Sequence, residues 1–302
     1  MSVEFGILGP LEVRAAGRAV PLGGSKPRAL LALLLLHPNE PVSADALAVA
    51  LWGEEAPARS TKTVHVHVSR LRKALGDPDA LTTTPAGYRL RVRPHELDAE
   101  RFRRLVDDGR RALAADEPEH AGALLREALA LRRGPPLAEL AFAPFAQGAI
   151  AALQEERLVA LETRLEADLR AGRHAELVPE LQRLVAEHPL RERLHGRLML
   201  ALYRAGRQAD ALEAYRHARA TLVEELGIEP GIELRELERA VLAQDPDLAA
   251  PAASGGPRHS ASASRSSAPA CSGSSAARAR RPSSTSRRKR SASSCSGRTR
   301  RR

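Results

Sequence analysis

Residues 60–75 carry two competing patterns of hydrophobic and polar positions. Valines alternate with histidines over residues 64–68, which is typical of a strand. A second set of apolar residues follows the spacing of one helical face: Val64, Val68, Leu71 and Leu75. Residues 72–75 favour helix, and Gly76 ends it. We therefore predict one helix over residues 61–75, with Ser60 as its N-cap.

The pattern around this helix predicts a small α+β domain. Residues 3–22 alternate and turn at glycines, which indicates short antiparallel strands. Two apolar helices are expected next, over residues 26–37 and, after Ser43 as N-cap, over residues 44–52. A hairpin is expected over residues 81–92. The order of elements is therefore strands, three helices and a hairpin, in a domain spanning residues 1–95.

Residues 96–245 are rich in Leu and Ala and predict an all-α domain. The sequence AGRHAEL at 171–177 returns as AGRQADAL at 205–212, an offset of 34 residues. This is the period of a tetratricopeptide helix pair, so a tetratricopeptide-like helical repeat is expected. The predicted helices are 98–115, 119–132, 150–171, 174–187, 190–204, 207–225 and 231–243.

The charge of +10 belongs mainly to the C-terminal segment. From residue 246 onward there are 13 Lys and Arg residues and one acidic residue, whereas residues 96–245 carry a net charge of −6. Residues 246–302 have hardly any large apolar side chain, so we predict a disordered basic tail. The run RRKR at 287–290 would bind anionic surfaces weakly; the alternatives are a solvated tail without a role and a frameshifted product.

The outer face of the helix at 61–75 has the composition of a helix that binds the DNA major groove. It lacks acidic residues altogether. Arg70 suits a guanine edge and Val66 a thymine methyl group. The phosphate-binding candidates are Lys62, Thr63, Arg72 and Lys73, and Ser69 and His65 lie on or beside the same face. The alternative is an ordinary basic surface helix.

His65 and His67 would share one face of a strand and could then bind a metal. On a helix they point about 200° apart, so we expect no metal site and assign His67 to a phosphate contact or to packing. The sequence GGSK at 23–26 is only a fragment of a phosphate-binding loop. No catalytic set stands out, so we expect no enzyme activity and no cofactor.

Three stretches make the chain resemble a known family: SKPRALLALLLLHPNEPVSADALAVALWG, TVHVHVSRLRKALG and TTTPAGYRL. They are similar to the winged-helix DNA-binding domain of response regulators, a class that belongs to phosphorelay signal transduction. With LDAERFRRLV and the segment AGRQADALEAYRHARATLVEELGIEPGIELRELERAVL, residues 1–245 resemble the Streptomyces antibiotic regulatory protein family. That family combines the winged helix with a bacterial transcriptional activator domain.

The resemblance implies a transcriptional activator that binds direct repeats near promoters of secondary-metabolite (antibiotic) genes, often beside RNA polymerase. It makes residues 61–75 the recognition helix and residues 81–92 the wing, with Arg89 and Arg91 as its basic residues. Many wings of this class carry an arginine where this chain has Thr84 and Pro85, so we do not expect strong minor-groove insertion. Residues 52–59 correspond to the segment that contacts polymerase, although Trp52 itself suits the core.

The expected partners are double-stranded DNA, RNA polymerase and further copies of the chain on DNA. No receiver domain precedes the winged helix, so no phosphoacceptor aspartate is expected. Both cysteines, Cys271 and Cys295, lie in the tail, and the chain opens directly with a strand pattern, which together favour the cytoplasm. The longest apolar run is too short to span a membrane. The rival hypothesis is a tetratricopeptide-like protein scaffold with a structural N-terminal domain.

Overall fold

The structure is a computed structural model that describes residues 3–53 and 60–249. Residues 1–2, 54–59 and 250–302 are not described. The predictions made for the cysteines, for the basic run at 287–290, for disorder beyond residue 249 and for most of the polymerase-contacting segment lie outside the described residues.

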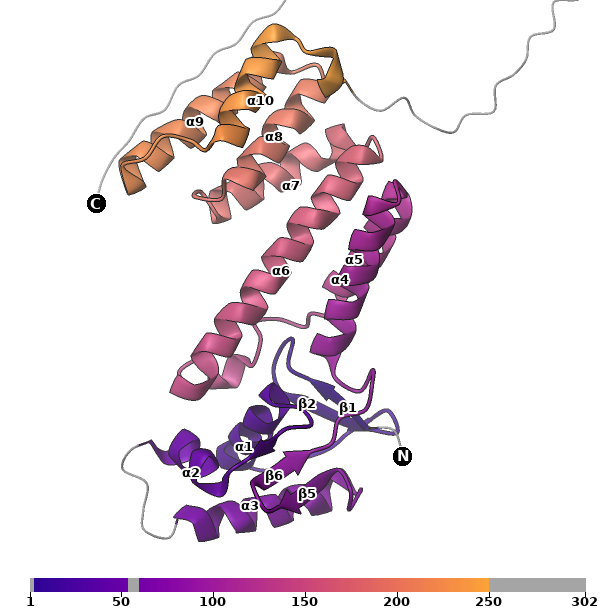
Figure 1. Ribbon diagram of the computed structural model, residues 1–302, viewed down its shortest axis with the longest axis vertical. Helices are drawn as coiled ribbons and strands as arrows, with labels where there is room; N and C mark the ends of the chain where they lie inside the picture. The colour runs from indigo at the N-terminus through magenta and orange to yellow at the C-terminus, as the bar shows by residue number, and fades with distance from the viewer. Residues whose placement is uncertain (1–2, 54–59, 250–302) are drawn as a thin grey trace, which may run out of the picture. The chain divides into compact units, whose positions relative to one another are not determined.

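The chain opens with a three-stranded antiparallel sheet, as its alternating pattern predicts (Figure 1). The strands are β1 (Val3–Gly6), β2 (Glu12–Ala15) and β3 (Arg18–Ala19), in that order across the sheet. Phe5 and Val13 are opposite each other in the register of β1 and β2, and both are buried. The period of two thus places one face of this small sheet on the core.

Three helices follow: α1 (Ser25–Leu36), α2 (Ala44–Trp52) and α3 (Ser60–Leu75). Most of the side chains of α1 are buried, which explains why its sequence is apolar on every side. The Ser43 hydroxyl accepts a hydrogen bond from the backbone N–H of Ala46 at 3.1 Å, so the predicted N-cap of α2 is present. The helical interpretation of residues 61–75 is confirmed.

A second sheet carries the predicted hairpin, formed by β5 (Leu81–Thr84) and β6 (Gly87–Leu90). The short strand β4 (Pro41–Val42), between α1 and α2, pairs with β6, so the strand order is β4-β6-β5. Gly87 has φ +136°, and a Cβ atom there would lie 2.1 Å from the Val42 carbonyl oxygen. Only glycine permits this close approach of the two strands.

The remaining described chain is helical, as predicted. Its α-helices are α4 (Asp98–Ala114), α5 (Pro118–Ala130), α6 (Pro144–Arg170), α7 (His174–Glu187), α8 (Glu192–Arg204), α9 (Gln208–Leu226) and α10 (Ile232–Ala243). Short 3-10 turns are η1 (Ala138–Leu140) and η2 (Pro246–Leu248). Helix α6 begins at Pro144 rather than at the predicted residue 150, because proline is compatible with a first helical turn.

The two copies of the sequence repeat form the same kind of turn. One connects α6 to α7 and the other connects α8 to α9. Gly172 and Gly206 adopt φ values of 80° and 76°, in the left-handed region. The N–H groups of the next residues, Arg173 and Arg207, donate to the carbonyl five residues earlier at 3.0 and 2.9 Å. The repeat therefore reflects a recurring helix–turn–helix unit.

The apolar side chains form two clusters. The first is continuous from β1 through the three N-terminal helices into α4, α5 and the first part of α6. The second extends from the later part of α6 through α10. The core therefore continues across residue 95, where the sequence placed a domain boundary.

Polar contacts reinforce the junction between β1 and α4. The two carboxylate oxygens of Asp98 accept hydrogen bonds from the backbone N–H groups of Ile7 and Leu8 at 2.8 and 3.0 Å. Arg133 Nη2 lies 3.1 Å from the same carboxylate, and the Arg133 N–H donates to the Leu8 carbonyl at 2.9 Å. The segment after β1 is thereby held by residues 90 or more positions away.

Glu139, in η1, makes a second junction with the same N-terminal segment. Its carboxylate accepts the Leu11 N–H at 3.0 and 3.1 Å and pairs with Arg28 of α1. Burial alone would raise the pKa of Glu139, but the hydrogen bonds from Arg28 and Leu11 together lower that pKa below its usual value. The carboxylate therefore stays charged at neutral pH.

Candidate nucleic-acid interface

Helix α3 has one buried face and one exposed face. The apolar side chains of the buried face are at most 3% exposed: Val64, Val68, Leu71 and Leu75. On the opposite side, the described surface exposes most of the predicted DNA-binding residues: Lys62, Thr63, His65, Val66, Ser69, Arg70 and Lys73. Val66 is 48% exposed, although valine is among the residues that are most often buried.

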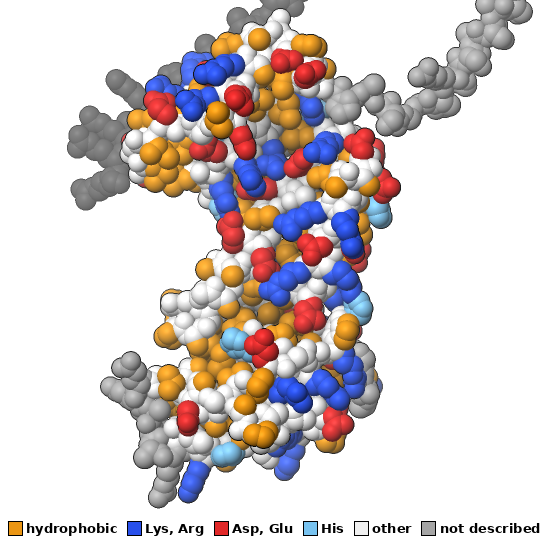
Figure 2. All heavy atoms as spheres, viewed as in Figure 1, with side chains coloured by type: hydrophobic (Ala, Val, Ile, Leu, Met, Phe, Trp, Pro, Cys, Tyr) orange, Lys and Arg blue, Asp and Glu red, His pale blue; other side chains and the backbone are white. Residues whose placement is uncertain are grey.

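The exposed face of α3 is positively charged. Among the described residues, Lys62, Arg70 and Lys73 have no carboxylate within 4 Å. Figure 2 shows Lys and Arg side chains projecting from the end of the molecule where α3 lies in Figure 1. Three unneutralised cations on one helix face suit a polyanion.

Arg72 differs from the other predicted phosphate ligands because it is half-buried. Its Nε donates to the Leu81 carbonyl at 2.7 Å, and its Nη2 donates to the Thr83 hydroxyl at 2.8 Å. Both partners belong to β5. In this structure Arg72 therefore connects the helix to the hairpin.

His65 makes a second connection between α3 and the hairpin. Its Nδ1 is hydrogen-bonded to the hydroxyl of Tyr88 in β6, and the two rings meet edge to face at 5.9 Å. Burial raises the pKa of Tyr88, so this hydroxyl keeps its proton. The sequence analysis did not predict a role for Tyr88. The alternation in GYRL could have indicated its inward position, because Tyr88 and Leu90 are both buried in β6.

His67 packs away from the exposed face. His67 is 9% exposed, and its ring stacks on that of Trp52 with the ring centres 6.3 Å apart. The ammonium group of Lys26 lies 5.5 Å from the centre of the Trp52 ring. Burial, with Arg70 and Lys26 nearby, lowers the pKa of His67. Of the two roles that the sequence left open for His67, the structure shows packing.

The two histidines thus have different neighbours, Tyr88 for His65 and Trp52 for His67. Within residues 3–53 and 60–249, no group of three His, Cys, Asp or Glu side chains is arranged to hold a metal ion. No helix in the same ranges is long and apolar enough to cross a bilayer.

The basic residues of the hairpin lie beside α3 in the fold. Arg89 and Arg91 are both exposed. Arg91 Nη2 lies 3.7 Å from Asp77, which also pairs with Arg93 at 3.7 Å, whereas Arg89 has no ion pair with a described residue. Among the described residues, Arg89 therefore has no acidic partner, unlike Arg91.

Comparisons with known proteins agree with this arrangement. The family model "Transcriptional regulatory protein, C terminal" matches residues 17–90, and the model "Bacterial transcriptional activator domain" matches residues 97–242. The regulatory protein DnrI of Streptomyces peucetius is 40% identical over 256 residues, which cover 82% of this chain and 94% of DnrI. This chain belongs to the Streptomyces antibiotic regulatory protein family.

Two further relatives are longer than this chain. The regulatory protein AfsR of Streptomyces coelicolor is 45% identical over 82% of this chain, which spans only 25% of AfsR. The structure of Mycobacterium tuberculosis EmbR in complex with a low-affinity phosphopeptide matches with a TM-score of 0.79 at 41% identity, over 81% of this chain and 66% of that one. By their names these relatives are regulatory proteins, and together with the family models they confirm the predicted fold class.

Proposed function

We propose that this antibiotic regulatory protein is a sequence-specific DNA-binding activator that places α3 in the major groove and the β5–β6 hairpin beside it. The observation that carries the proposal is the exposed face of α3, where Lys62, Arg70 and Lys73 have no described acidic partner. A helix in the major groove presents its outer face to base edges and phosphates together.

The exposed residues divide into two groups by chemistry. Arg70 and Val66 suit base edges, because a guanidinium can bind guanine bidentately and an apolar side chain can contact the thymine methyl. Lys62, Thr63 and Lys73 suit phosphates, and Arg89 extends the positive surface along the hairpin. Arg72 and His65 act by orienting the helix, since their side chains are engaged by β5 and β6.

We further propose where this activator binds and which partners it contacts, as the family resemblance implies. The activator would bind direct repeats near promoters of a secondary-metabolite cluster, associate with further copies on that DNA and contact RNA polymerase. The family membership and the size of DnrI, most of which this chain matches, support this extension. The rival scaffold hypothesis predicts no specific DNA binding.

The test is a gel-shift titration of the full chain on promoter fragments from the gene's neighbourhood, with competitor DNA and at two salt concentrations. We expect specific binding that weakens steeply with salt. Arg70→Ala should weaken binding by about 1–3 kcal/mol and relax specificity at one base pair, whereas Lys73→Ala should weaken binding to all sequences alike.

Arg110→Ala is the matched control, because Arg110 is an exposed arginine of α4 outside the interface. Absence of specific binding by the full chain would refute the proposal. Equal loss on every sequence in Arg70→Ala would show that Arg70 holds a phosphate.

A further inference from the structure

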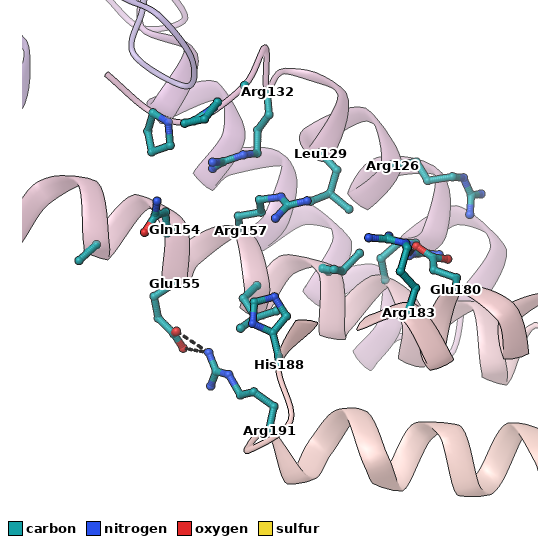
Figure 3. A pocket seen from close by; sticks show the side chains of 17 residues that line it. Arg126, Leu129, Arg132, Gln154, Glu155, Arg157, Glu180, Arg183, His188 and Arg191 are labelled. Carbon is teal, nitrogen blue, oxygen red and sulfur yellow. Dashed lines mark hydrogen bonds and ion pairs between the residues drawn. The ribbon is translucent and has the colours of Figure 1, made fainter. Parts of the chain in front are cut away.

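The helical part of the chain contains a large cavity between α5, α6, α7 and the segments that follow α5 and α7 (Figure 3). Its volume is about 1210 Å³. Ligand pockets of proteins commonly have volumes of roughly 300–1,000 Å³, so the cavity can admit a small organic molecule. The proposed DNA interface does not use it.

The charges that line this cavity are predominantly positive. Its described lining contains six arginines and two glutamates. Four of these arginines have carboxylate partners. Arg126 and Arg164 both bind Asp168 at 2.9 Å, Arg183 binds Glu187 at 2.6 Å and Arg191 binds Glu155. Asp168 is shared with Arg173, while Arg164 also pairs with Glu180, so each of the four side chains has at least one carboxylate partner within the fold.

Arg132 and Arg157 are the two exceptions. Neither forms an ion pair with a described residue, and Figure 3 shows their side chains near one another in the cavity. Arg132 is half-buried and donates to the Leu153 carbonyl at 3.2 Å. Burial, and then the positive charge of Arg157, lowers the pKa of Arg132, although the carboxylates of Asp98 and Glu156 act in the opposite direction. Two guanidinium groups that form no ion pair repel each other in a partly buried place, and a ligand with two negative charges would relieve their repulsion.

The wall beside these arginines is apolar. Leu158 and Leu161 line it and are 8% and 7% exposed, and Leu129 packs against both apolar clusters of the protein. Gln154 and His188 add polar groups at the edge. The cavity therefore combines a cationic pair with an apolar surface, which suits a molecule that is charged at one end only.

We propose that this cavity binds a small organic phosphate. The phosphate groups would lie on the guanidinium groups of Arg132 and Arg157, which match phosphate oxygens bidentately. The organic part would lie against Leu129, Leu158 and Leu161. The site is separate from α3, so the proposal stands independently of the DNA-binding one.

The test is isothermal titration of ADP, pyrophosphate and adenosine into the full chain. We expect ADP to bind, pyrophosphate to bind more weakly because it lacks the apolar part, and adenosine not to bind. Arg157→Gln and Arg132→Gln should each weaken ADP binding by about 10- to 100-fold, the effect of removing a charge-assisted hydrogen-bonding group.

Two controls separate this site from other basic surfaces. Arg170→Gln changes an exposed arginine of α6 outside the cavity, and Arg70→Ala changes the α3 face; neither should alter ADP binding. Arg157 is exposed, so Arg157→Gln should fold, which far-ultraviolet circular dichroism checks. Unchanged ADP binding in the Arg132→Gln, Arg157→Gln double variant overturns the proposal, and so does the absence of ADP binding at about 1 mM.

Discussion

Asp98 offers the sharpest test of how the N-terminal domain is held to the helices. Its side chain is 12% exposed and accepts the Ile7 and Leu8 N–H groups while pairing with Arg133. The change Asp98→Asn keeps the shape of the side chain. It replaces one of the two accepting oxygens with an NH₂ group, so the N–H group of Ile7 or Leu8 then faces another donor. It also removes the negative charge beside Arg133.

The expected magnitude follows from these contacts. A partly buried N–H group left without an acceptor costs about 1–3 kcal/mol, and loss of the charge-assisted bond to Arg133, which is 34% exposed, adds about 1 kcal/mol. We therefore expect Asp98→Asn to lower the free energy of unfolding by about 2–4 kcal/mol. For a chain of this size that corresponds to a decrease in Tm of about 5–15 °C.

The assay is urea unfolding of the full chain followed by circular dichroism, compared with Asp107→Asn. Asp107 lies on the same helix but is 66% exposed, and its one ion pair within the described chain is with Arg110 at 3.3 Å. Its substitution should change stability by less than about 0.5 kcal/mol. If both variants lost the same small amount, the Asp98 contacts would not hold the junction and the reasoning would be wrong.

Three further predictions concern the hairpin, the buried histidines and the connection through Arg72. Gly87→Ala should destabilise the chain strongly, because the new Cβ would meet a carbonyl of β4, whereas Gly148→Ala, in open space on α6, should stabilise it by about 0.5–1 kcal/mol; thermal unfolding compares them. Burial lowers the pKa of His67 and His195 below 6.5, so the unfolded chain binds protons more readily, and unfolding free energy should fall as pH drops through about 6.5. In the double variant His67→Asn, His195→Asn, the unfolding free energy from urea titrations at several pH values should depend less steeply on pH. An unchanged slope would show that these two histidines do not cause the pH dependence. Arg72→Met should lower stability by about 1–3 kcal/mol in the same assay, since two hydrogen bonds to β5 are lost, and wild-type stability would show that they contribute little.

Much of the fold could be predicted because it depends on local periodicity. The spacing of Val64, Val68, Leu71 and Leu75 outweighed the strand propensity of the valines, since it marked the face that α3 buries. The repeated AGR sequences likewise located two equivalent turns. The start of α6 was missed because Pro144 and Gly148 suggest a loop, although the helix accommodates both.

The contacts that join β1 to the helices could not be predicted from sequence. Asp98 stands at the beginning of α4, where an acidic residue is ordinary for the helix dipole, and nothing local indicates that it accepts N–H groups from Ile7 and Leu8. The same applies to Glu139, whose partner Leu11 lies 128 residues away. Long-range polar pairing leaves no periodic signal.

For the candidate interface, the helical wheel predicted which residues are exposed but could not assign those at the edge of the exposed face. Arg72 and His65 lie there, and tertiary partners in β5 and β6 decide their roles. Because these side chains tie α3 to the hairpin, the helix and the proposed wing already have a fixed relative orientation in the free protein. Such preorganisation reduces the conformational entropy lost on binding. It follows that substitutions at Arg72 or His65 should weaken DNA binding through the positioning of Arg70, rather than through a lost phosphate contact.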